Sequence, residues 1–82
     1  MNKPPLPSPA VAQAIRILDY LGHVKAQAGV SEIARALGMG KSNCFHILTT
    51  MAAFGVVTKD RNAVYRLGPN LVELGTASRR NF

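Results

Sequence analysis

The first segment with a periodic pattern of apolar residues follows a proline-rich start. One face of this segment carries apolar residues at i, i+3, i+4 and i+7 spacing, namely Val11, Ala14, Ile15, Leu18 and Gly22. Ser8 is a residue type that caps free helix amides, and Pro9 fits the first helical position, where its missing N–H costs nothing. We therefore predict a helix from Pro9 to about residue 21 or slightly beyond, packed on the core through that stripe.

Two further periodic segments follow, separated by only three residues. Their apolar stripes are Val30, Ile33, Ala34 and Leu37 in the first, and Cys44, Ile47, Leu48 and Met51 in the second. Gly38 can adopt the left-handed conformation past a helix end, and Gly55 stops the later segment. The pattern predicts helices over about 30–37 and 40–54. A short glycine-containing turn between two short helices is typical of a helix-turn-helix.

After the third helix the pattern changes from helical to extended. Val56–Lys59 and Val64–Leu67 predict two short strands. The polar turn 60–63 joins them, and within it Asn62 is the residue type that tolerates a positive φ. Pro69 opens a final helix. The predicted fold is mainly α with a small β-hairpin: a winged helix-turn-helix of three helices plus a wing, followed by the start of a linker helix.

The length of 82 residues allows one domain. We expect residues 1–8 to form a flexible N-terminal arm, since they include Pro4, Pro5 and Pro7. Residues 9–67 form the winged helix-turn-helix domain, with the helix-turn-helix itself at about 30–54. Residues 68–82 form the linker helix.

Composition narrows the class of function. The four carboxylates are well separated, and one cysteine with two histidines does not make a plausible metal site, so we expect no enzyme, no cofactor and no metal. No apolar run approaches the roughly 18 residues that span a membrane, and we expect a cytoplasmic, nucleoid-associated protein. The ten Lys and Arg against four Asp and Glu give a net charge of +6. Such a charge indicates a polyanionic partner, with nucleic acid first.

The third helix has an exposed face suited to reading DNA. At about 100° per residue, that face is small, hydrogen-bonding and free of carboxylates. We predict base readout in a major groove by Ser42, Asn43, His46 and Thr49. For Ser42 and Asn43 the alternative is capping of the first turn or plain exposure. Phe45 either packs on the side of the second helix, which we favour, or meets a thymine methyl group.

The basic residues divide by position along the fold. The candidates for contact with the DNA backbone are Ser31, Arg35, Lys41, Lys59, Arg61 and Arg66. Arg61, at the tip of the wing, is the best candidate for a phosphate or minor-groove contact. Capping is an equal alternative for Ser31, and simple solvation is one for Arg35. Residues 35–66 hold five basic residues and one acid, so they supply 5 − 1 = +4 of the net charge.

Four parts of the sequence, in order, resemble a known family. The chain is similar to the helix-turn-helix domain of IclR-type bacterial transcriptional regulators at residues 14–19, at 29–42, at 47–51 with 55–57, and at 65–75. Three residues depart from the family pattern. Gly40 stands where the family often has proline, and Phe45 and His46 stand where it often has histidine and arginine. The usual base contacts of the family therefore do not transfer to Phe45 and His46.

The resemblance implies a larger assembly. Such regulators join the DNA-binding domain through a linker helix to a C-terminal domain that binds a small-molecule effector. We therefore expect a fragment, or a naturally short relative without that domain. Two alternative functions stay open: a winged-helix dimerisation module that does not bind DNA, and an RNA-binding winged helix.

A second apolar strip on the first helix predicts self-association. The strip consists of Gln13, Ile17, Tyr20 and Val24. A surface helix normally needs one apolar stripe, so we expect the second to form the interface of a homodimer or higher oligomer on a near-palindromic double-stranded operator. The alternative is that the N-terminal arm or the linker helix covers it.

Overall fold

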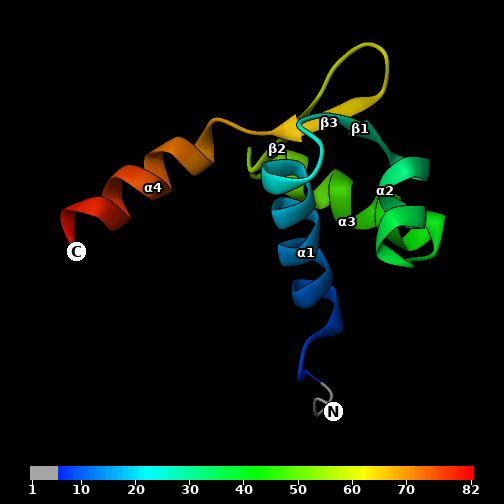
Figure 1. Cartoon of the computed structure of the whole chain (residues 1–82), viewed down its shortest axis with the longest axis horizontal. Helices are drawn as coiled ribbons and strands as arrows, with labels where there is room; N and C mark the ends of the chain where they lie inside the picture. Colours follow the sequence, from blue (N-terminus) through cyan, green and yellow to red (C-terminus); the bar gives the residue numbers. More distant parts are fainter. Residues whose placement is uncertain (1–5) are drawn as a thin grey trace.

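A computed structural model describes residues 6–82 of the chain (Figure 1). Residues 1–5 of the predicted N-terminal arm lie outside the described residues. The elements are α1 (Pro9–His23), β1 (Ala28–Gly29), α2 (Val30–Leu37), α3 (Lys41–Ala53), β2 (Val57–Lys59), β3 (Val64–Leu67) and α4 (Asn70–Arg80). The predicted order of three helices, hairpin and final helix is confirmed. No helix among residues 6–82 has both the length and the apolar character needed to cross a membrane.

The turn between α2 and α3 is set by local chemistry. Gly38 adopts the left-handed conformation with φ 66° and ends α2, as predicted. The Met39 N–H donates to the Ala34 carbonyl at 2.9 Å, and the Met39 side chain is buried in the core. This combination fixes the angle at which α3 leaves α2.

The sheet has three antiparallel strands in the order β1-β3-β2. In the hairpin, Val57 pairs with Leu67 and Lys59 with Tyr65. The third strand is a correction, because the sequence predicted only the two strands of the hairpin. Ala28 and Gly29 pair with Tyr65 and Val64 of β3. Two residues carry no periodic pattern of their own, and only the neighbouring strand makes them a strand.

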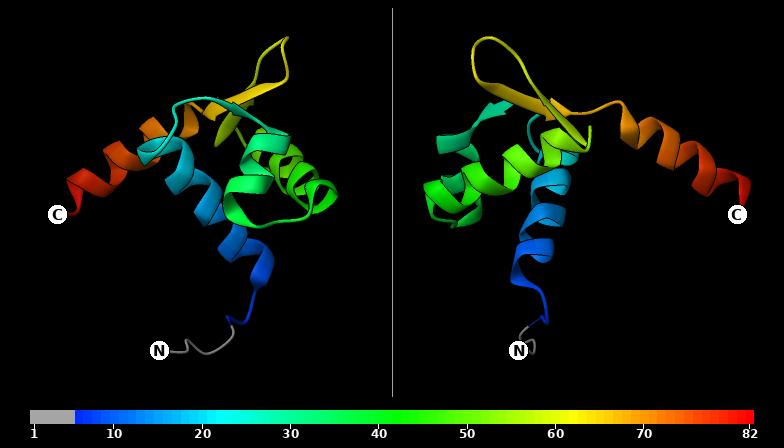
Figure 2. Two further views of the ribbon diagram at one scale, coloured as in Figure 1. Left: turned by 45° about the vertical axis from the view of Figure 1, so that its right-hand side comes forward. Right: turned by 180° about the vertical axis from the view of Figure 1, so that it is seen from behind.

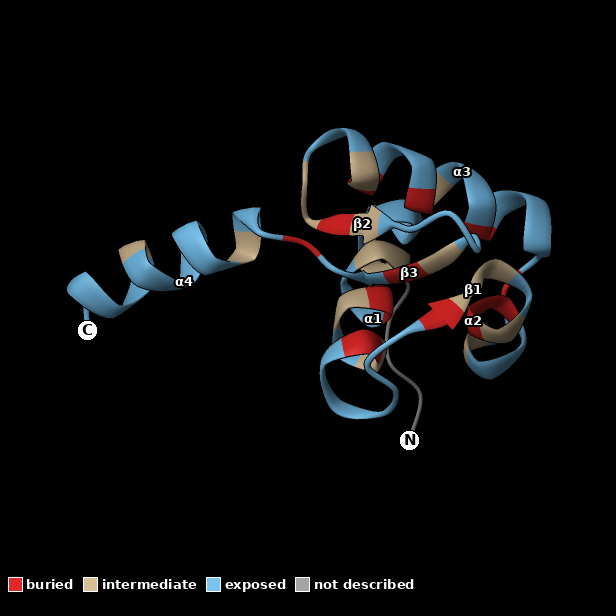
Figure 3. Ribbon diagram, turned by 90° about the horizontal axis from the view of Figure 1, so that it is seen from above, coloured by how far each residue is buried: buried red, intermediate tan, exposed pale blue. Residues whose placement is uncertain are grey.

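The core lies between α1, α2, α3 and the sheet (Figure 3). Its fully buried side chains are Ile17, Ile33, Cys44, Leu48 and Val57. The predicted stripes of α2 and α3 face this core, although Val30, Leu37 and Ile47 are only partly buried. Apolar periodicity placed these two helices correctly because each has a single apolar stripe.

The predicted inward face of α1 is right for Ala14 and Leu18, which pack against the core, and wrong for Val11 and Ile15. Val11 and Ile15 are 60% and 52% exposed, whereas Ile17 is 0% exposed and Leu21 lies in the core. Both strips of this helix satisfy the same spacing, so periodicity alone could not choose between them. The Ser8 prediction is wrong in part: Ser8 occupies the N-cap position before Pro9 but makes no side-chain capping hydrogen bond.

The joint between the body and α4 is built from backbone. The Gly68 N–H donates to the Val56 carbonyl at 2.9 Å, and the Asn70 N–H donates to the Gly55 carbonyl at 3.1 Å. The Asn70 side-chain amide also donates to the Phe54 carbonyl. A Cβ on Gly68 would lie 2.2 Å from the Gly55 oxygen, so only glycine fits there. Beyond this joint α4 projects away from the body and contains no buried residue (Figure 2).

Candidate nucleic-acid interface

The side of α3 that faces away from the core presents the predicted reading residues. Ser42, Asn43, His46 and Thr49 are all exposed. Gly40 occupies the N-cap of α3, and no side chain caps this helix. The capping alternative for Ser42 and Asn43 is therefore wrong. Their contacts with bases stay predictions.

Hydrogen bonds within the chain change what two of these residues offer a base. The Asn43 side-chain amide donates to Oε1 of Gln13 at 2.9 Å, which ties the start of α3 to α1. The Thr49 hydroxyl donates to the Phe45 carbonyl at 2.8 Å, so only its oxygen remains to accept. In this conformation Ser42 and His46 are the residues with full freedom to donate or accept.

Phe45 is exposed, contrary to our preference for packing. Its side chain is 43% exposed and lies outside the core cluster. The Lys59 ammonium of β2 lies 5.9 Å from the Phe45 ring centroid, and the His46 ring lies at 6.1 Å. Lys59 lies equally close to the buried ring of Tyr65. The Phe45 ring therefore lies outside the core, on the side of α3 that faces Lys59 of the wing.

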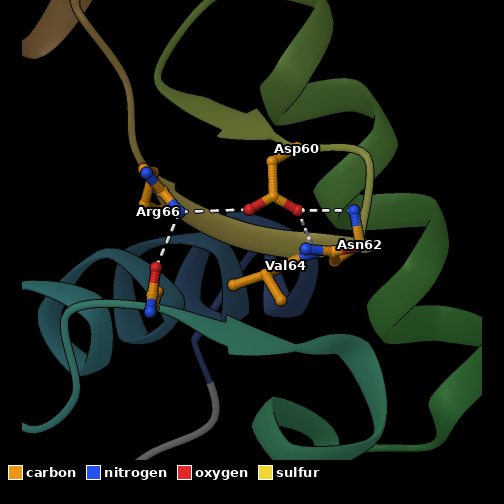
Figure 4. A network of polar contacts seen from close by, with 5 residues as sticks. Asp60, Asn62, Val64 and Arg66 are labelled. Carbon is orange, nitrogen blue, oxygen red and sulfur yellow. Dashed lines mark hydrogen bonds and ion pairs between the residues drawn. The ribbon is translucent and has the colours of Figure 1, made fainter.

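The turn of the wing is organised by one carboxylate (Figure 4). Oδ1 of Asp60 accepts hydrogen bonds from the backbone N–H of Asn62 at 2.8 Å and of Val64 at 3.1 Å. The positive φ of the turn falls on Ala63, at 59°, and the expectation that Asn62 would supply it is wrong. The reason is that Asp60 holds the Asn62 amide on the inside of the turn, which moves the left-handed residue one place along the chain.

Arg66 braces the wing against the rest of the domain. Its guanidinium donates to Oδ2 of Asp60 at 3.1 Å and to Oε1 of Gln27 at 2.6 Å (Figure 4). Gln27 directly precedes β1, so the contact joins both edges of the sheet. Part of the positive charge that we assigned to DNA is thus engaged within the chain.

Most of the other basic residues of this surface have no acidic partner in the described part of the chain. Glu32 pairs with Lys25, and this hydrogen bond and charge raise the pKa of the Lys25 ammonium. Asp60 pairs with Arg66. Within residues 6–82, four exposed basic residues of the helix-turn-helix and wing form no ion pair: Arg35, Lys41, Lys59 and Arg61. Ser31 is also exposed, at the start of α2.

Sequence reasoning missed the structural role of Arg16. Its guanidinium donates to the Leu37 carbonyl at 2.9 Å, where a cation complements the negative end of α2. The two residues are 21 positions apart. No local pattern signals such a contact.

The predicted dimer strip on α1 does not form one exposed surface. Ile17 is fully buried and Tyr20 packs against the core. Gln13 is bonded to Asn43, and only Val24 is largely exposed. The assignment of Ile17 to an interface is therefore wrong, because α2, α3 and the sheet cover that side of the helix.

Cys44 is a core thiol, as expected. Burial raises its pKa, which disfavours the thiolate and with it nucleophilic or metal-binding chemistry. The part of the chain that the structure describes brings together no three His, Cys, Asp or Glu residues that could hold a metal ion.

Comparison with known proteins shows which family the chain resembles. The model of the IclR helix-turn-helix domain matches residues 10–61. The HTH-type transcriptional regulator XynR of Escherichia coli K12 is 31% identical over 67 residues, which cover 80% of this chain and 27% of that protein.

Solved structures agree. The IclR transcriptional regulator of Alicyclobacillus acidocaldarius superposes with a TM-score of 0.85 at 36% identity, covering 89% of this chain and 30% of that one. IclR of Thermotoga maritima gives 0.78 at 29% identity, covering 88% and 29%. The chain thus spans less than a third of the length of these relatives.

Proposed function

This chain belongs to the family of IclR helix-turn-helix domains, and on that premise we propose that it binds double-stranded DNA in transcription regulation. One observation carries the proposal: the exposed face of α3 has no carboxylate and is flanked by cations without an ion-pair partner within residues 6–82. Such a face approaches a phosphate backbone without repulsion and offers hydrogen bonds to base edges.

In the complex, α3 enters the major groove. Ser42 and His46 lead the base readout, since both are exposed and the start of a recognition helix is the part that reaches base edges. Asn43 contributes its remaining N–H and its carbonyl oxygen, and Thr49 contributes an acceptor. The positive first turn, with Lys41, contacts the adjacent phosphates.

The wing contacts the backbone or the minor groove through Lys59 and Arg61. Arg66 holds the wing at its base and adds a contact only if a phosphate replaces Asp60. Ser31 and Arg35 of α2 face the phosphates on the other side of the groove.

For the assembly, we propose what the family resemblance implies. This domain acts as part of a homodimer or higher oligomer on a near-palindromic operator, and a C-terminal domain of the kind that completes the relatives binds the effector. For a regulator with this partner we propose a location in the cytoplasm, at the nucleoid. The reaction with DNA is binding alone, without an enzymatic step or a cofactor.

Selection from a random duplex pool tests the proposal. We expect enrichment of a defined site, and His46→Ala weakens binding to it by about 1–3 kcal/mol while relaxing the preference at one base position. His23→Ala is the matched control, since His23 lies at the C-terminal end of α1 and its ring Nδ1 bonds the Asp19 carbonyl of the same helix at 3.1 Å. Equal binding to single-stranded RNA, or no enriched duplex, would contradict the proposal.

Salt dependence tests the wing. Lys59→Ala and Arg61→Ala each remove about one phosphate contact, so in each variant the negative slope of log affinity against log salt becomes shallower by about 1 on any duplex. Arg80→Ala removes the same charge at the end of α4 and leaves the slope unchanged. An unchanged slope in both wing variants would exclude the wing from the binding surface.

A further inference from the structure

Phe45 is the one large apolar side chain of α3 that is exposed. Its ring lies outside the core cluster and beside Lys59 of the wing. The exposed part of the ring adds nothing to the core, and the helix propensity of phenylalanine is modest. The exposed part of the ring is therefore available for contact with a partner outside the chain.

The neighbours of the ring indicate which partner fits. Ser42 and Thr49 lie one helical turn before and after Phe45, and His46 follows it directly. The Lys59 ammonium lies 5.9 Å from the ring centroid, so a phosphate paired with this cation would stand close to the ring. The ring thus occupies the border between the base-reading face of α3 and the phosphate-binding wing.

Only one major-groove group suits a side chain without donors or acceptors. The amino and carbonyl groups of adenine, guanine and cytosine would lose hydrogen bonds to water against a phenyl ring, whereas the 5-methyl group of thymine gains from apolar contact. We infer that Phe45 is a specificity-determining residue that reads a pyrimidine 5-methyl group at the groove edge nearest the phosphates bound by Lys59. This inference rests on the proposed function, and it concerns one base position within the site.

Replacing thymine by deoxyuridine tests the inference without changing the protein. The probe is the duplex that the parent chain selects from a random pool, with each thymine replaced in turn. Deoxyuridine keeps base pairing and removes only the methyl group. We expect the parent to bind about four-fold more weakly at one thymine per half-site, the value for one methyl group returned to water. Phe45→Ala should bind the thymine and deoxyuridine duplexes equally at that position.

Phe54→Ala is the matched control. Phe54 is 70% exposed at the C-cap of the same helix, but it borders α4 together with Val56 and Leu74. This variant should keep the full four-fold effect. A second measurement compares cytosine with 5-methylcytosine at the same position, where the parent should prefer the methylated duplex by the same factor.

Three results overturn the inference, and they are distinguishable. A chain that selects no duplex overturns the proposed function and this inference with it. A selected duplex in which deoxyuridine has no effect at any thymine leaves the function standing and refutes methyl readout. A deoxyuridine effect of equal size in the parent and in Phe45→Ala assigns the methyl contact to another residue.

Discussion

The body of the domain and α4 are both ordered, but different interactions hold them. The body is stabilised by side chains buried between three helices and a sheet, including Ile17, Ile33 and Leu48. The helix α4 has no buried residue and is fixed at its start by the backbone of Gly68 and by Asn70 (Figure 3). Apolar burial therefore determines the fold of the body, whereas local backbone geometry determines the direction in which α4 leaves it.

The largest effect should come from emptying the core of the body. Leu48 is fully buried at the centre of α3, and Leu48→Ala removes about 2–5 kcal/mol from the free energy of unfolding. A domain of this size has few kilocalories to spare, so we expect a largely unfolded chain. Urea denaturation followed by circular dichroism measures it. A loss below about 1 kcal/mol would mean that the core is not packed as described.

The joint of α4 should be the next most sensitive place. Gly68→Ala puts a Cβ 2.2 Å from the Gly55 oxygen, and we expect a loss of about 1–3 kcal/mol together with altered amide signals at the start of α4. Gly75→Ala is the control within α4, because nothing lies within 4 Å of its added Cβ. That change should raise helicity and stability by about 0.5–1 kcal/mol. The same sign for both changes would contradict the joint.

Alkaline pH should lower the free energy of unfolding of the body, without an effect on α4. Burial raises the pKa of the Cys44 thiol and of the Tyr65 phenol from ordinary values of 9.0 and 10.0. Above those values the unfolded chain releases protons that the folded chain retains, so the free energy of unfolding falls as pH rises, by at most about 1.4 kcal/mol per pH unit for each group. In Cys44→Ala the decline should begin near pH 10 instead of pH 9. An unchanged onset would show that the thiol does not contribute.

The smallest effect should come from the apolar surface of α4. Leu74 is 61% exposed, and alanine has an equal or better helix propensity. Leu74→Ala should therefore change the free energy of unfolding of the monomer by less than about 0.5 kcal/mol. A loss of more than 1 kcal/mol in urea denaturation would mean that α4 packs on the body and that the two regions are not distinct.

Sequence alone predicted the parts of the fold that local chemistry controls. Glycine readily adopts the left-handed conformation that ends a helix, so Gly38 marked the end of α2. Each of α2 and α3 has one apolar stripe, so the buried face of each helix was unambiguous. The hairpin followed from the change of period at Val57. The four reading residues of α3 were correctly placed on its exposed side, while their contacts with DNA stay predictions.

The errors arise where a distant partner decides. Two strips of α1 fitted the helical spacing equally well, and only the packing of the sheet and the other helices on Ile17 determines which strip is buried. Ala28 becomes a strand residue only beside β3. Phe45 is exposed beside Lys59 of the wing, 14 positions later. None of these contacts leaves a periodic signal in the sequence.

The joint at Gly68 gives the domain a mechanical property. The 11 residues of α4 extend about 16 Å at 1.5 Å per residue. A rotation of about 10° at Gly68 and Asn70 therefore displaces the far end of the helix by about 3 Å, as much as the length of a hydrogen bond. Conversely, a displacement of that size at Arg80 corresponds to a rotation of only about 10° at the joint beside Gly55, two residues past α3. The position of the far end of α4 is thus geometrically linked to the backbone next to the proposed DNA-reading helix.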